Sequence, residues 1–90
     1  MIEVYHNTNF LNFITDKTVL KENLNKVATI NTSNLEEAFV LTQNIDANWT
    51  NSSKVETELD KARSTSAGDV LLKDKIYYCV DLVGFFEIDL

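Results

Sequence analysis

The residues best suited to chemistry lie in one short polar stretch, Arg-Ser-Thr-Ser-Ala-Gly-Asp at residues 63–69. The stretch combines a guanidinium, three hydroxyls and a glycine, so a phosphate or carboxylate could bind to Arg63 and to backbone N–H groups. It lacks the Gly-x-x-x-x-Gly-Lys-Ser/Thr pattern of a P-loop. We favour a turn that leads into a strand, in which Ser66 or Asp69 bonds to the local backbone and Arg63 pairs with Asp69 or Asp81. The candidate ligand-binding residues are Arg63, Ser64, Ser66, Gly68 and Asp69.

The chain has few groups for nucleophilic or metal chemistry. His6 is its only histidine and Cys79 its only cysteine, and no Cys-x-x-Cys, His-x-x-x-His or calcium-loop spacing occurs. Cys79 lies in the middle of an expected strand, where cysteine usually acts as a small apolar residue. Ser66 is not part of a Gly-x-Ser-x-Gly elbow. We therefore expect no catalytic residue, no metal site and no cofactor, with His6 at the surface or rim.

Large aromatic residues offer a different kind of site. Trp49 and Tyr77 fall outside the clearest inward-facing sets, and Trp and Tyr are enriched where proteins bind each other. If they were exposed together they would mark a partner surface, so both are candidate binding residues. For Trp49 we favour the alternative, in which the indole folds back over the core. For Tyr77 the two interpretations are balanced.

The charge of the chain restricts its partners. Eight Lys and Arg against 14 Asp and Glu give a net charge of −6, and the basic residues are scattered. Nucleic acids and anionic membranes are therefore disfavoured, whereas a basic protein partner suits the chain. The single cysteine excludes an intramolecular disulfide, and neither a secretion signal nor a membrane-spanning stretch is recognisable. We expect a cytoplasmic protein.

A chain of 90 residues with 44% hydrophobic residues and no proline is expected to form one globular domain, residues 1–90. Alternating or β-branched patterns predict strands at residues 2–5, 26–30, 70–72, 76–82 and 85–90. A Ser33-x-x-Glu36 capping box predicts a helix over 34–46. A second box, Ser53-x-x-Glu56, favours a helix over 54–63, although the same stretch alternates as an edge strand would. Residues 7–25 are expected to form short helices or irregular structure.

The patterns also predict which residues face inward. Ile2 and Val4 should be buried, and Gly68 should adopt a positive φ. Gly84 should mark a bend between two strands. The expected fold is α+β, a curved antiparallel sheet or partly open small barrel packed against one or two helices. Ile76, Tyr78, Val80 and Leu82 should share one face of their strand, and Phe86, Ile88 and Leu90 should face inward on the next strand.

The C-terminal third resembles the YodL-like domains, uncharacterised modules of bacteria, plasmids and phages. The resemblance rests on Arg-Ser-Thr-Ser-Ala-Gly-Asp-Val at 63–70, Tyr-Tyr-Cys-Val-Asp at 77–81 and Gly-Phe at 84–85. Those domains carry Arg-x-x-Ser-x-Gly-Asp-Val, Tyr-Tyr-x-Val-Asp and Gly-Phe. A weaker similarity over 35–49 extends the match to residues 26–90. The resemblance implies a small α+β fold and a mobile-element context, but no activity and no catalytic residues.

Three functional hypotheses follow. The first is a non-enzymatic protein-interaction module, a small accessory protein of a phage or mobile element that binds a host or viral protein. The alternative is an anion- or nucleotide-binding domain that uses the 63–69 loop. The third is a nucleic-acid contact or a DNA mimic, in which acidic residues imitate phosphates. The sequence leaves both a monomer and a homodimer open.

Overall fold

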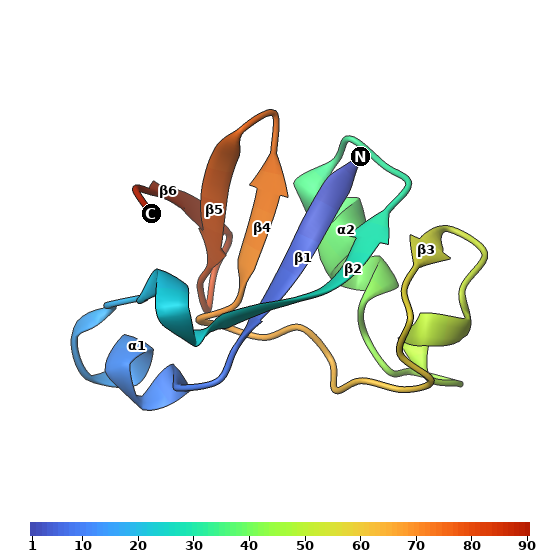
Figure 1. The fold of residues 1–90 in the computed structure, drawn as a ribbon, viewed down its shortest axis with the longest axis horizontal. Coiled ribbons are helices and arrows are strands. Elements are labelled where there is room, and N and C mark those ends of the chain that lie inside the picture. The colour runs from blue at the N-terminus through green and yellow to red at the C-terminus, as the bar shows by residue number, and fades with distance from the viewer.

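The computed structural model describes residues 1–90 and confirms the expected α+β class. Six antiparallel strands form one open sheet in the order β3-β2-β1-β4-β5-β6, accompanied by two helices (Figure 1). The sheet is not closed into a barrel. The elements are β1 (Ile2–Asn7), α1 (Phe10–Asp16), β2 (Leu24–Ile30), α2 (Leu35–Leu41), β3 (Val55–Glu56), β4 (Val70–Lys73), β5 (Ile76–Val80) and β6 (Phe85–Ile88), with 3-10 turns at Lys21–Asn23 and Trp49–Asn51.

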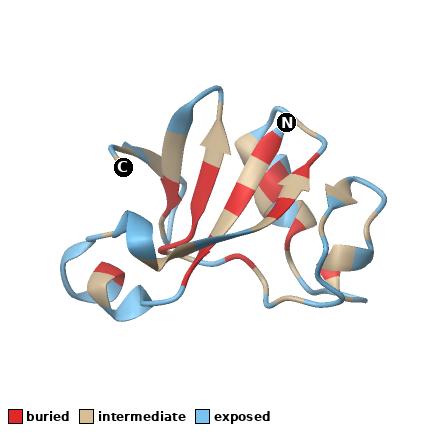
Figure 2. Cartoon of the chain, viewed as in Figure 1, coloured by how far each residue is buried: buried red, intermediate tan, exposed pale blue.

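The main core lies between α2 and one face of the sheet. Ile2 and Val4 of β1 are fully buried there, as the alternation of residues 2–5 predicts. β1 holds the middle of the sheet because it pairs with β2 on one side and β4 on the other. Figure 2 shows the resulting buried bands along β1 and β4. The core cluster comprises Ile2, Val4, Ala28, Ile30, Ala38, Trp49, Leu71 and Val80.

Helix α2 begins one residue later than predicted and ends earlier. Its N-cap is Asn34, whose side chain accepts a hydrogen bond from the Glu37 N–H at 2.9 Å, so the Ser33-x-x-Glu36 box is wrong. Asn and Ser are about equally good N-caps, and the sequence offers both in succession. The helix ends at Leu41 because the Thr42 hydroxyl and the Gln43 amide bond to its last carbonyls.

The predicted helix over 54–63 is wrong. Val55 and Glu56 instead form the short edge strand β3 against Ile30 and Thr29, which was the alternative interpretation. The rest of the segment is irregular because distant side chains bond to its backbone. The Thr50 hydroxyl donates to the Asp60 carbonyl at 2.9 Å, and two asparagine amides donate to that of Ala62. These bonds replace the contacts that a helix would make within itself.

The two C-terminal hairpins have different turns. The β4–β5 turn places Asp74 and Lys75 at φ 51° and 68°, the geometry of a tight two-residue hairpin turn. The β5–β6 turn is closed by a bond from the Asp81 N–H to the Gly84 carbonyl at 3.0 Å, with Gly84 at φ 74°. Strand β5 therefore stops at Val80, and Leu82 lies exposed at the tip. Its predicted place within the strand is wrong.

This turn also sets which phenylalanine of β6 faces the main core. Phe85 pairs with Val80 and packs against the core cluster, whereas Phe86 pairs with Cys79 on the opposite face. The predicted inward set of Phe86, Ile88 and Leu90 therefore does not face the main core.

Helix α1 covers one end of the opposite face. Its buried Phe13 stacks on Phe86, with ring centroids 6.5 Å apart. Gly68 has φ 93°, as predicted, and a Cβ atom there would lie 3.2 Å from the Phe13 side chain. Residues 7–25 contain α1 and a 3-10 turn, in agreement with the expectation of short helices. Both helices are seven residues long, and neither could cross a bilayer.

Candidate functional site

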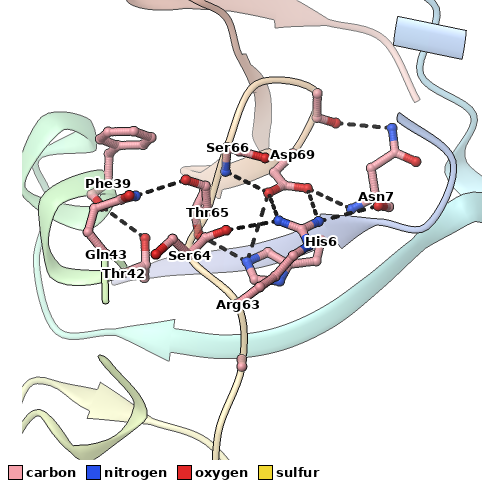
Figure 3. Close-up of polar contacts among 12 residues, drawn as sticks. His6, Asn7, Phe39, Thr42, Gln43, Arg63, Ser64, Thr65, Ser66 and Asp69 are labelled. Carbon is pink, nitrogen blue, oxygen red and sulfur yellow. Dashed lines mark hydrogen bonds and ion pairs between the residues drawn. The ribbon is translucent and has the colours of Figure 1, made fainter. Parts of the chain in front are cut away.

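The 63–69 loop is organised around the carboxylate of Asp69, which is 1% exposed (Figure 3). Both terminal nitrogens of Arg63 donate to it, Nη1 to Oδ2 at 2.7 Å and Nη2 to Oδ1 at 2.8 Å. The backbone N–H groups of Asn7 and Ser66 also donate to it, each at 2.8 Å. The predicted pairing of Arg63 with Asp69 and the predicted turn are confirmed. The buried charge is therefore fully compensated.

Arg63 has little capacity left for a ligand. Besides Asp69, its Nη1 donates to the Ser64 carbonyl at 2.9 Å and its Nη2 to the Asn7 carbonyl at 3.3 Å. Each N–H of the two terminal nitrogens thus has an acceptor. The bond to Asp69 raises the pKa of the Arg63 guanidinium above its ordinary value. Arg63 acts as a clamp that holds the loop against the end of β1.

The other predicted loop residues belong to the same network. The Ser64 hydroxyl accepts from the Asn44 N–H at 2.8 Å, which ties the loop to the segment after α2. Gly68 donates its N–H to the Val80 carbonyl at 2.8 Å and accepts from the Asn7 amide at 3.1 Å. The structure therefore brings Arg63, Ser64, Ser66, Gly68 and Asp69 together, with their polar groups used largely within the fold.

Two members of the network, His6 and Asn7, were missed in the sequence. His6 is only 7% exposed, so its predicted place at the surface or rim is wrong. Its Nε2 lies 3.0 Å from the Thr65 hydroxyl and 3.9 Å from Asp69 Oδ2. Burial lowers the pKa of His6, Asp69 opposes that effect and Arg63 adds to it. The signal was present, because alternation along β1 places Ile2, Val4 and His6 on one face.

The geometry around His6 does not form a nucleophilic relay. In a Ser-His-Asp triad the two ring nitrogens of histidine face different partners, the nucleophile and the acid. Here the same Nε2 faces both Thr65 and Asp69, and Thr65 is 1% exposed. Cys79 is also fully buried, and burial raises the pKa of its thiol to about 11. None of these groups is placed to attack a substrate.

Trp49 is part of the core and not of a surface. Its side chain is buried, and its indole N–H donates to the Arg63 carbonyl at 2.7 Å. The favoured interpretation, an indole folded back over the core, is confirmed. The partner surface predicted to combine Trp49 with Tyr77 therefore does not include Trp49.

A hollow of about 560 Å³ adjoins the loop. Arg63 and Ser66 line it from the loop, and His6, Asn7 and Asn25 line it from β1 and β2. This is the concavity that an anion-binding site would need. However, its only cation is Arg63, whose charge Asp69 already neutralises. Phe10 and Val27 also line the hollow, which suits an uncharged molecule better than a phosphate.

Tyr77 is not part of this polar network and lies on the sheet face opposite the main core. Leu72, Tyr77 and Ile88 stand side by side on β4, β5 and β6, and Tyr5 meets the Tyr77 ring edge-on at 6.3 Å. With Phe86, these residues form what we call the open face. Helix α1 covers only its Phe86 end, while α2 lies on the other side of the sheet (Figure 1).

The rim of the open face is held by charged groups. The Tyr5 hydroxyl donates to Glu3 Oε1 at 2.9 Å, and Lys26 Nζ lies 3.3 Å from the same oxygen. Burial, with Glu3 as a second cause, raises the pKa of Tyr5 to about 12. Tyr5 therefore stays neutral over the physiological range, and the centre of the open face is uncharged.

Comparison with family models, with curated proteins and with solved structures found no match for this chain.

Proposed function

We propose that this chain is a small protein-binding module whose partner, a host or viral protein, docks on the open face. The observation that carries the proposal is the uncovered row of Leu72, Tyr77 and Ile88, extended by Tyr5. All four side chains are only partly exposed, because each is flanked by its neighbours on adjacent strands. Such a rigid aromatic and aliphatic surface resembles the centre of protein interfaces, where Tyr is enriched.

The charge distribution supports a protein partner over a nucleic acid. The chain carries −6 overall, and two of its scattered cations, Lys54 and Arg63, are already paired with Glu37 and Asp69. Phosphate binding needs free cations on one surface. The same pairing weakens the DNA-mimic hypothesis, because Glu37 is engaged with Lys54 and with the Thr32 hydroxyl.

The biological setting is part of the proposal. The resemblance of residues 63–85 to YodL-like domains supports an accessory protein of a phage or mobile element, acting in the cytoplasm. The clamp between Arg63 and Asp69 gives that motif a structural purpose. The resemblance therefore supports a shared fold, while the function rests on the open face.

The proposal is tested by site-specific photo-cross-linking in host lysate. A benzophenone side chain at position 77 should capture one stoichiometric partner, whereas the same group at Ile45, which is 76% exposed and distant from the open face in sequence, should not. An excess of untagged wild-type chain should compete for the partner and reduce cross-linking. Untagged Tyr77→Ser should compete at least tenfold less effectively, as expected for an interface anchor. Equal capture from both positions, or an unaffected Tyr77→Ser competitor, would contradict the proposal.

The hollow at the loop supports the alternative, a small-molecule site next to Arg63 and Ser66. This alternative and the open face make opposite predictions for a thermal-shift assay. Stabilisation by ATP or inorganic phosphate would favour the anion site. Because the charge of Arg63 is compensated, we expect neither compound to raise the melting temperature.

A further inference from the structure

We infer that β6 receives an extended, basic segment of the partner protein, which pairs with it as a seventh strand of the sheet. This inference rests on the proposed function and names the chemistry of the partner. The adjoining open face would then continue onto the added strand. Main-chain hydrogen bonds would give the contact its affinity, and alternate side chains would give it specificity.

The two edges of the sheet differ in how they are protected. On one side, β3 is only two residues long, and the Thr57 hydroxyl donates to the Val27 carbonyl of β2 just beyond it at 2.6 Å. On the other side, β6 has four residues, pairs only with β5 and does so in unbroken register. Its sequence, Phe-Phe-Glu-Ile, has no proline, lysine or bulge, which are the usual protections of an edge.

The unpaired backbone groups of β6 can be assigned from the turn. The Asp81 N–H donates to the Gly84 carbonyl, so residues 81 and 84 are a hydrogen-bonded pair. Such pairs alternate along an antiparallel ladder. Phe86 and Ile88 therefore point their N–H and C=O groups toward β5. Those of Phe85 and Glu87 point away from the sheet, toward the position of a seventh strand.

Hollows at both ends of β6 give an added strand room for side chains. One of about 460 Å³ lies between the start of α2 and the start of β6, where Leu35, Glu36 and Phe85 line it. Another of about 290 Å³ lies at the end of β6, where Tyr77 and Ile88 line it with the acids Glu87 and Asp89. Both ends of β6 therefore border space that an added segment could enter.

Charge identifies the occupant. The acids Glu36, Glu87 and Asp89 border this edge together with Lys73 and Lys75, and none of the five forms an ion pair. Glu87 is the only charged residue within β6 itself, so an added strand would face an acid and no lysine there. A second copy of the chain is disfavoured, because β6 paired with itself would bring these acids near one another. A partner strand with Lys or Arg on the Glu87 side and apolar residues on the Ile88 side satisfies both faces.

The test uses a capped eight-residue peptide that alternates lysine with valine, and a control peptide that alternates glutamate with valine. Calorimetry should detect the lysine peptide alone. Glu87→Pro, which removes an outward N–H, should weaken binding at least tenfold, and Glu87→Gln, which keeps the N–H, should weaken it about threefold. Glu56→Gln makes the same charge change on β3 and should leave binding unchanged. Equal binding of both peptides, or full binding by Glu87→Pro, would overturn the inference.

Hydrogen exchange gives a readout in the unmodified chain, which keeps the test valid even if Glu87→Pro fails to fold. The amides of Phe85 and Glu87 should exchange rapidly in the free chain and slow at least tenfold with the lysine peptide. Unchanged exchange would overturn the inference. So would a dimer in sedimentation whose association protects the same amides, because the occupant would then be a second copy. If the cross-link from position 77 persists in Glu87→Pro, only the edge contact fails and the open face stands.

Discussion

At the scale of single residues, the Asp69 carboxylate is the group on which most of the loop depends. It accepts hydrogen bonds from the backbone of β1, from the loop backbone and from Arg63, so it joins the two ends of the loop to the end of β1. The spacing of Arg63 and Asp69 in the sequence was enough to predict their pairing. The part played by Asn7 was not predictable, because it lies 62 residues away along the chain.

Asp69→Asn should lower the free energy of unfolding by about 2–4 kcal/mol, because it removes a buried acceptor and leaves Arg63 without its counter-charge. The lower part of that range reflects the partial exposure of Arg63. Urea denaturation measures the difference. Asp46→Asn makes the same change at an exposed site without side-chain partners and should stay within about 0.5 kcal/mol of the wild type. Equal effects of the two substitutions would show that the carboxylate network is not stabilising.

His6 should make stability depend on pH. Its pKa is lowered in the folded chain by burial, so the unfolded chain binds a proton more readily. The free energy of unfolding is then highest above the ordinary histidine pKa, about 6.5, and falls as the pH drops below it. Urea denaturation at pH 7.5, 6.5 and 5.5 should show this decline.

The chosen range separates His6 from the carboxylates. The pKa values of Glu37 and Asp81 are lowered, Glu37 mainly by its bond to Thr32 and Asp81 by its bond to Lys17, so their contributions are lost only at more acidic pH. His6→Gln, which cannot take up a proton, should flatten the decline between pH 7.5 and 5.5. A variant that declines as steeply as the wild type would assign the effect to another group.

At the scale of elements, the strands were more predictable than the helices. Alternating or β-branched apolar residues located β1, β4 and β5 closely. β1 buries alternate residues, whereas β4 and β5 bury neighbouring residues on both faces. The segment 54–63 was misjudged because its carbonyls are bonded by Thr50, Asn48 and Asn44, a competition that no local pattern records. The orientation of Phe85 and Phe86 was inverted because it depends on the length of the turn at Gly84.

The start of α2 offers a test between two adjacent caps. Asn34→Ala should cost about 1 kcal/mol in the free energy of unfolding, because the Glu37 N–H loses its acceptor. Ser33→Ala, one residue earlier, should cost less than about 0.5 kcal/mol because Ser33 makes no side-chain hydrogen bond in this cap. Denaturant midpoints of the two variants provide the comparison. The opposite order would place the cap at Ser33 after all.

At the scale of the whole molecule, the α+β class and the presence of an antiparallel sheet followed from composition and alternation. The order of the strands did not, because nothing in the first seven residues indicates that they pair with residues 70–72. The candidate site was affected in the same way. The loop was recognised as a unit, but the hollow beside it is completed by His6 and Asn7, which the fold brings in from β1.

The central place of β1 also governs how the chain can be made. β1 is synthesised before β4 and needs that strand, more than 60 residues later, before both of its edges are paired. Contacts so distant in sequence slow folding, because a long segment must be ordered before they form. Synthesis that stops before residue 70 yields a chain without β4, β5, β6 or Asp69. Such fragments would retain unpaired, apolar strand edges and be exposed to aggregation and proteolysis.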